Sequence, residues 1–150
     1  MRPFLIVALL LAGFQAQAGG PAGRDSPAVA VARAHIEAWS HHDYDKARKS
    51  LAADVHVTVT TTLPIMAPTD TTGADVYMAG LKKFANAVEP GSARVIASIG
   101  DEHNALLMVT VKAAFGPNGA KVTVPAARLY LLDEEKKIKV EQVIFFPLKD

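Results

Sequence analysis

The stretch SHHDYD at residues 40–45 places two histidines beside two aspartates, a set of side chains that could bind a metal ion. Neighbouring residues on a helix point about 100° apart, so His41 and His42 cannot readily hold one ion as histidines four residues apart do. No third ligand is identifiable in the sequence, which also contains no cysteine. We therefore expect no metal site here, and the sequence indicates no cofactor.

His35 is the residue best suited to proton transfer, because imidazole titrates near neutral pH. It precedes Trp39 by one helical turn and lies at the edge of an apolar stripe. The simpler alternative is a hydrogen-bonded, partly buried histidine with no catalytic role, and the sequence favours it because no orienting partner is obvious. His35 is therefore a candidate acid or base, and the catalytic residues stay unknown.

Glu141 is the best partner that the sequence offers to His35. It is in phase with Val143 and Phe145 in a C-terminal strand, and an acid among apolar neighbours can have a raised pKa. The alternative, which we favour slightly, puts Glu141 on the solvent face together with Lys139. In that case the inward residues would be Val140, Ile144 and Phe146.

The elements that must position these groups follow from the periodicity of apolar residues. Residues 27–43 and 44–55 have helical spacing, and residues 55–62 alternate as a half-buried strand. A loop over 63–73 ends in Thr72 and Asp75, which resemble a capping box for a third helix carrying Tyr77 and Phe84. Four more strands follow at 93–100, 104–115, 121–132 and 137–146. The order predicts an α+β fold with helices on one face of an antiparallel sheet.

Two segments carry a resemblance to a known family: AVARAHIEAWSHHDYDKARKSLAADVHV in the first half and AARLYLLDEEKKIKVEQVIFF near the end. They resemble the SnoaL-like branch of the nuclear transport factor 2-like superfamily, over nearly all of 28–147. The resemblance implies a strongly curved sheet with three helices on its concave face, forming a cystatin-like cone with an apolar pocket. It also implies that residues 43–45 form a corner between two helices, where Asp43 can cap the second.

The resemblance allows a residue-by-residue comparison with ketosteroid isomerase, a member of that superfamily. An overlay without gaps places the tyrosine of that enzyme at His35, its base aspartate at Val59 and its second acid at about Ala127. Valine and alanine cannot move a proton or donate a hydrogen bond, so that mechanism is not expected. The implied pocket is lined by His35, Trp39, Val59, Tyr77, Phe84 and Ala127.

The first residues predict export. Arg2 precedes an apolar run at residues 4–14, and AQA follows at 16–18, which is typical of a cleavable signal peptide. The run is shorter than the ~20 residues of a membrane-spanning helix, so we expect no span in the mature chain and a periplasmic or secreted protein. The predicted organisation is a signal peptide at 1–18, a flexible linker at 19–27 and one domain at 28–150.

Charge and family resemblance together limit the function. The chain has 16 Lys and Arg against 15 Asp and Glu, and losing Arg2 would leave the mature chain neutral, which argues against nucleic acid as a partner. We expect the pocket to bind a small hydrophobic molecule without catalysis. The alternative is a SnoaL-like isomerase, cyclase, dehydratase or hydrolase on a small hydrophobic substrate, with His35 as acid or base. We also expect a homodimer through the outer face of the sheet, including His56, Thr58, Arg128 and Tyr130.

Overall fold

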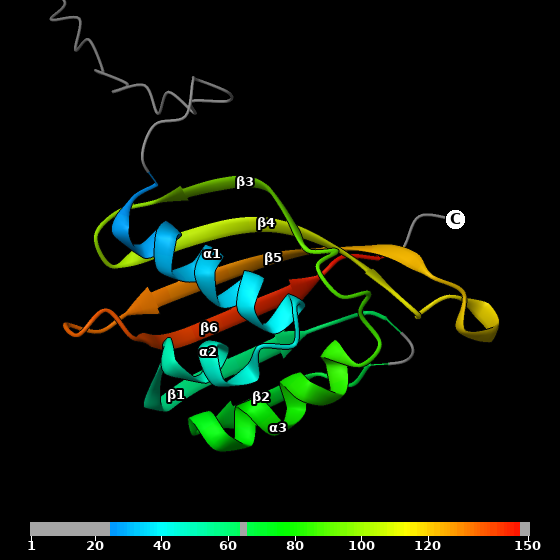
Figure 1. The fold of residues 1–150 in the computed structure, drawn as a ribbon, viewed down its shortest axis with the longest axis horizontal. Coiled ribbons are helices and arrows are strands. Elements are labelled where there is room, and N and C mark those ends of the chain that lie inside the picture. The colour runs from blue at the N-terminus through cyan, green and yellow to red at the C-terminus, as the bar shows by residue number, and fades with distance from the viewer. Residues whose placement is uncertain (1–24, 64–65, 148–150) are drawn as a thin grey trace, which may run out of the picture.

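The computed structural model describes residues 25–63 and 66–147, so the predicted signal peptide and most of the predicted linker lie outside the described residues. Within these residues the fold is α+β, as predicted, with three α-helices and a six-stranded sheet (Figure 1). The helices are α1 (Pro27–Ser40), α2 (Tyr44–Lys49) and α3 (Ala74–Ala85), with a short 3-10 helix at Pro117–Gly119. The strands are β1 (Leu51–Thr60), β2 (Thr69–Thr72), β3 (Arg94–Gly100), β4 (Asn104–Ala113), β5 (Val122–Leu132) and β6 (Ile138–Phe145).

The first helix has the start and the buried face that its sequence predicts. The Ser26 side chain accepts a hydrogen bond from the backbone N–H of Val29, and Pro27 occupies the first turn, where its missing N–H costs nothing. Val29, Ile36 and Trp39 are buried on one face. This face packs α1 across β3, β4 and β5 (Figure 1).

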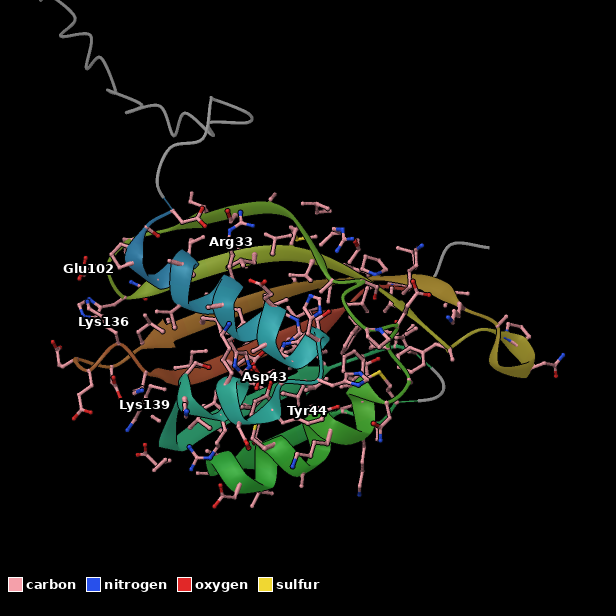
Figure 2. The ribbon with its side chains drawn as sticks, in the orientation of Figure 1. Arg33, Asp43, Tyr44, Glu102, Lys136 and Lys139 are labelled. Atoms are coloured by element: carbon pink, nitrogen blue, oxygen red, sulfur yellow. The ribbon has the colours of Figure 1, made fainter. Side chains whose placement is uncertain are left out.

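The corner between α1 and α2 is confirmed at SHHDYD. Helix α1 ends at Ser40, and Asp43 caps α2 by accepting a hydrogen bond from the backbone N–H of Lys46 at 3.1 Å. His42 adopts a left-handed backbone conformation, with φ of 62°, which turns the chain between the helices. Figure 2 shows Asp43 and Tyr44 at this corner.

The start of α3 differs from the prediction. Thr72 pairs with His56 as the last residue of β2, a strand inside the segment expected to be a loop. The residue before α3 is Gly73, with φ of 100° and no side-chain capping bond, so the capping box of Thr72 and Asp75 is wrong. Strand pairing holds the backbone of Thr72 extended, and glycine makes the turn that follows.

The sheet has the order β2-β1-β6-β5-β4-β3 and is mixed. The four C-terminal strands form the expected antiparallel meander, and β2 is antiparallel to β1. Strand β1, however, runs parallel to β6, so the expectation of a purely antiparallel sheet is corrected at this one pair. Between these two strands the chain passes through β2, α3, β3, β4 and β5, which gives it the long crossover that parallel neighbours require.

The faces of β5 were predicted with the wrong phase. Arg128 and Tyr130 are buried on the helix-covered face, whereas Ala127 is only partly buried on the opposite one. The outward residues of this strand are almost as apolar as the inward ones, so alternation gave no clear phase. The outward-facing residues are Pro125, Ala127, Leu129 and Leu131.

In the residues that the structure describes, no helix is long and apolar enough to cross a membrane.

Helix α3 lies over β1 and β2 on the same side of the sheet as α1 (Figure 1). The space between α3 and the sheet contains the candidate site.

Candidate ligand-binding site

A cavity of about 170 Å³ lies between α3 and strands β1, β2, β5 and β6. Most of its wall is apolar, as is usual for sites that bind small molecules. Its ionisable lining residues, among those described, are Tyr77 and Arg128. The full lining comprises Val57, Val59, Met66, Ala67, Thr69, Thr71, Val76, Tyr77, Gly80, Leu81, Phe84, Arg128, Val143 and Phe145.

Aromatic rings fix one end of the cavity. The ring of Phe84 on α3 lies 5.8 Å from that of Trp39 on α1 and 5.6 Å from that of Phe145 on β6, as distances between centroids. These tilted contacts are favourable beyond the area that they bury. They connect both helices to the sheet, so this part of the wall is held by packing.

A buried carboxylate, Glu141, organises the polar end of the cavity. One oxygen accepts a hydrogen bond from Arg128 Nη1 at 2.7 Å, and the other accepts one from the Tyr77 hydroxyl at 2.6 Å. Glu141 is fully buried, so the prediction that it faces solvent is wrong. The alternation of residues along β6 predicted the wrong face for Glu141 because the pairing of β5 with β6 shifts between Leu131 and Leu132. This shift changes which residues of β6 point inward. Isolated buried charges are costly, and here each carboxylate oxygen has a donor.

Only one nitrogen of the Arg128 guanidinium, Nη1, donates to Glu141. Its guanidinium carbon lies 5.1 Å from the centre of the Trp39 ring, a distance typical of cation–π contacts. Its Nε is buried and has no hydrogen-bond partner among the described residues. Burial opposes the charge, but interactions with Tyr130 and Glu141 outweigh it, so the pKa of Arg128 is raised above its ordinary value. This side chain stays a cation.

Tyr77 also keeps its proton. Burial and the nearby charge of Glu141 raise the pKa of its hydroxyl well above 10.0. Because that hydroxyl donates to Glu141, only the lone pairs of its oxygen remain to contact a ligand. Tyr130, opposite Glu141 on β5, has its pKa raised by burial and by the same carboxylate.

His35 lies behind this layer. Its Nδ1 is 2.7 Å from Ser50 Oγ and 3.1 Å from the Ala47 carbonyl oxygen. Ser50 donates its own proton to Ala47 O at 2.6 Å, so Nδ1 must carry the proton that completes the bond to Ser50. Nε2 is then an unprotonated nitrogen, 3.9 Å from Glu141 Oε2 and without a hydrogen bond in the described chain. Burial lowers the pKa of His35 despite the attraction of Glu141, so the ring is neutral and the contact is no ion pair.

The cavity includes some of the residues expected from sequence and omits others. Val59, Tyr77 and Phe84 line it. His35 and Trp39 are buried but do not belong to its described lining, and Ala127 faces the other side of the sheet. A role in ligand binding stays a prediction for all six residues.

Arg128 is the main residue that sequence reasoning missed. A signal was present, because Arg128 is in phase with Val124, Ala126, Tyr130 and Leu132, all buried in the structure. The ungapped overlay with ketosteroid isomerase placed Ala127 inward instead, and this choice turned Arg128 outward.

Solved structures share this fold at low sequence identity. A protein of Kribbella flavida DSM 17836 is 23% identical with a TM-score of 0.65, over 81% of this chain and 88% of that chain. A protein of Catenulispora acidiphila DSM 44928 with a ketosteroid isomerase-like fold, in complex with trimethylamine, is 14% identical with a TM-score of 0.60, over 75% and 82%. An LEH-like epoxide hydrolase of M. tuberculosis is 16% identical with a TM-score of 0.60, over 80% and 83%. At these identities the likeness shows the fold alone.

No curated protein matches the sequence significantly. The model of the SnoaL-like domain family, by contrast, matches residues 32–141, well over half of the chain. This stretch runs from within α1 to Glu141 on β6 and so includes most of α1, all of α2 and α3, and most of the cavity wall. The protein therefore belongs to the SnoaL-like family, within the nuclear transport factor 2-like superfamily.

Proposed function

We propose that this protein binds a small, largely apolar molecule in the cavity between α3 and the sheet, without catalysis. The observation that carries the proposal is the hydrogen bonding at the cavity wall, where Tyr77 donates its proton to Glu141 and Arg128 pairs with the same carboxylate. Tyr77 and Arg128 both have raised pKa values, and both keep their protons near neutral pH. A ligand therefore meets an arginine donor and a tyrosine oxygen, but no group poised to exchange a proton.

The alternative is a SnoaL-like enzyme of isomerase, cyclase, dehydratase or hydrolase type, with His35 as acid or base. One observation favours it: neutral His35 has an unpaired Nε2 facing Glu141. The family fold also supports an epoxide hydrolase in M. tuberculosis. Against this, Glu141 already accepts bonds from Tyr77 and Arg128, and a substrate in the cavity would have to reach His35 past them.

One comparison separates the two functions. Native mass spectrometry of protein purified from its own host should find a retained small molecule. His35→Phe should then leave the affinity for that molecule nearly unchanged, because His35 does not line the cavity. Conversion of the molecule by the wild-type protein, abolished in His35→Phe, would overturn the binding proposal in favour of the enzyme.

We also propose that the protein is exported through a cleavable signal peptide at residues 1–18, to the periplasm or outside the cell. The basic start, the apolar run and the AQA sequence support this. The intact mass of the exported protein should correspond to a chain starting at Gly19. A mass that includes residues 1–18 would contradict it.

A homodimer through the outer face of the sheet is proposed as well, with a corrected surface. Arg128 and Tyr130 are buried and cannot take part, whereas apolar side chains on the outer face are exposed: Ile99, Leu106 and Ile144. Neighbouring strands bring Ile99 next to Leu106, and exposed apolar patches of this kind mark protein interfaces. Light scattering should give twice the monomer mass at micromolar concentration, and Leu106→Lys should give the monomer mass.

A further inference from the structure

Gly80 shapes the mouth of the cavity. It lies inside α3, where glycine weakens a helix relative to alanine, and it is exposed at the cavity lining. A methyl group added at Gly80 would meet no atom within 4 Å, so packing within the protein does not require glycine there. Gly80 is both exposed and part of the lining, so it lies where the cavity opens to solvent. A longer side chain at this position would project over it.

The charges at the inner end of the cavity limit what can bind. Arg128 and Glu141 are joined at 2.7 Å, and their charges cancel. An anionic ligand at Arg128 would lose its water, and the charge of Glu141 behind the guanidinium would repel it. A neutral oxygen acceptor avoids that cost, and it can accept from the Arg128 guanidinium, which lines the cavity and uses only Nη1 in its hydrogen bond to Glu141.

The size of the cavity limits the rest of the ligand. At about 170 Å³ it is close to the ~150 Å³ of an engineered cavity that binds benzene. The wall around this volume is formed by aliphatic and aromatic side chains, including Val57, Leu81 and Phe145. A single ring or a short branched chain fills such a space.

We propose that the ligand is a neutral compound of about one-ring size whose carbonyl or ether oxygen accepts a hydrogen bond from Arg128, and whose apolar body passes Gly80 at the mouth. This inference rests on the proposed binding function and adds its ligand class. It also assigns two roles: Arg128 holds the oxygen, and Gly80 keeps the mouth open.

Three probe molecules of similar size test the ligand class on the wild-type protein: acetophenone, ethylbenzene and benzoate. Kd values from NMR titration should be lowest for acetophenone, about tenfold or more below that of ethylbenzene, as expected for a hydrogen bond to a charged group. Benzoate should bind more weakly than acetophenone. Equal binding of acetophenone and ethylbenzene would overturn the inference and leave the binding function intact. Tightest binding of benzoate would show an anion site instead, and no binding of any probe would contradict both proposals.

Two sets of variants test the residue roles. Arg128→Met with Glu141→Gln removes both charges, keeps an acceptor for Tyr77, and should make acetophenone and ethylbenzene bind equally. Gly80→Leu should weaken acetophenone binding by about tenfold or more, while Ala79→Leu, at an exposed neighbour outside the lining, should leave it unchanged. Both leucine variants are checked for folding by thermal unfolding. A folded Gly80→Leu protein with wild-type affinity for acetophenone would show that the ligand does not enter the cavity past Gly80.

Discussion

The two longer helices cover the same face of the sheet but bury it differently (Figure 1). Helix α1 crosses β3, β4 and β5 and fills the contact with Val29, Ile36 and the fully buried ring of Trp39. Helix α3 lies over β1 and the four-residue β2 and leaves a cavity. Large side chains close one half of the molecule, and a helix containing Gly80 keeps the other half open. The first half provides stability, and the second has room for a ligand.

Substitutions at the border between the two halves, where Arg128 pairs with Glu141, should change the stability of the protein most. Arg128→Met leaves Glu141 as an unpaired buried charge, and we expect a loss of about 3–5 kcal/mol in the free energy of unfolding. The double variant Arg128→Met with Glu141→Gln should recover most of that loss. Urea denaturation of both proteins and the wild type measures the difference. Equal losses in the single and double variants would mean that the ion pair is not what holds this region together.

The stability of the half covered by α1 should depend strongly on Trp39. Trp39→Ala removes a ring that contacts Phe84 and the Arg128 guanidinium, and should cost about 3–5 kcal/mol of unfolding free energy. Val76→Ala is the matched control in the open half. Val76 is 64% exposed, so its truncation should change stability by no more than about 0.5 kcal/mol. A Val76 effect as large as that of Trp39 would contradict the division into halves.

Acid should destabilise the protein through His35. Burial puts the pKa of His35 in the folded state below its ordinary value of 6.5, so the fold favours the neutral ring. The contribution is therefore fully present above pH 6.5 and is lost as the pH falls from 6.5 towards the folded-state pKa, by at most about 1.4 kcal/mol per pH unit. The charged groups facing the ring are Glu141, which opposes the shift, and Arg128, which adds to it.

The measurement is the free energy of unfolding between pH 7 and pH 5. The surface carboxylates Asp54, Glu89 and Glu102 have lowered pKa values from lysine partners, so their contributions are lost only at lower pH. Figure 2 shows one such pair, Glu102 and Lys136, at the turns beside the ends of β4 and β5. His35→Asn, which keeps an N–H donor near Ser50, should flatten the slope. An unchanged slope in this variant would show that another group titrates.

The sequence predicts most of the fold because its periodicity is strong where one face is buried. The spacing of Val29, Ile36 and Trp39 fits a helix and not a strand. Asp43 caps α2 as expected. Prediction fails where local patterns are ambiguous. Pairing of β2 with β1 depends on a residue 16 positions away, His56 with Thr72, which local alternation does not reveal.

The site is harder to predict for a related reason. Its polar centre joins Arg128 on β5, Glu141 on β6 and Tyr77 on α3, and charged residues are ordinarily assigned to solvent. Only the register that pairs Tyr130 with Glu141 shows that all three side chains point inward. His35 on α1 lies beside them, with its Nε2 at 3.9 Å from Glu141 Oε2, but does not line the cavity.

The smallest effect concerns Gly80 and stability alone. Its backbone is helical and an added methyl group meets nothing, so Gly80→Ala should raise the free energy of unfolding by about 0.5–1 kcal/mol through the unfolded chain. Thermal unfolding measures it, with Gly73→Ala as the contrasting variant. Gly73 has φ of 100°, a conformation that alanine rarely adopts, so that change should destabilise the protein. If Gly80→Ala also destabilised it, the helix would need glycine for its own packing, and the open mouth would no longer distinguish α3 from α1.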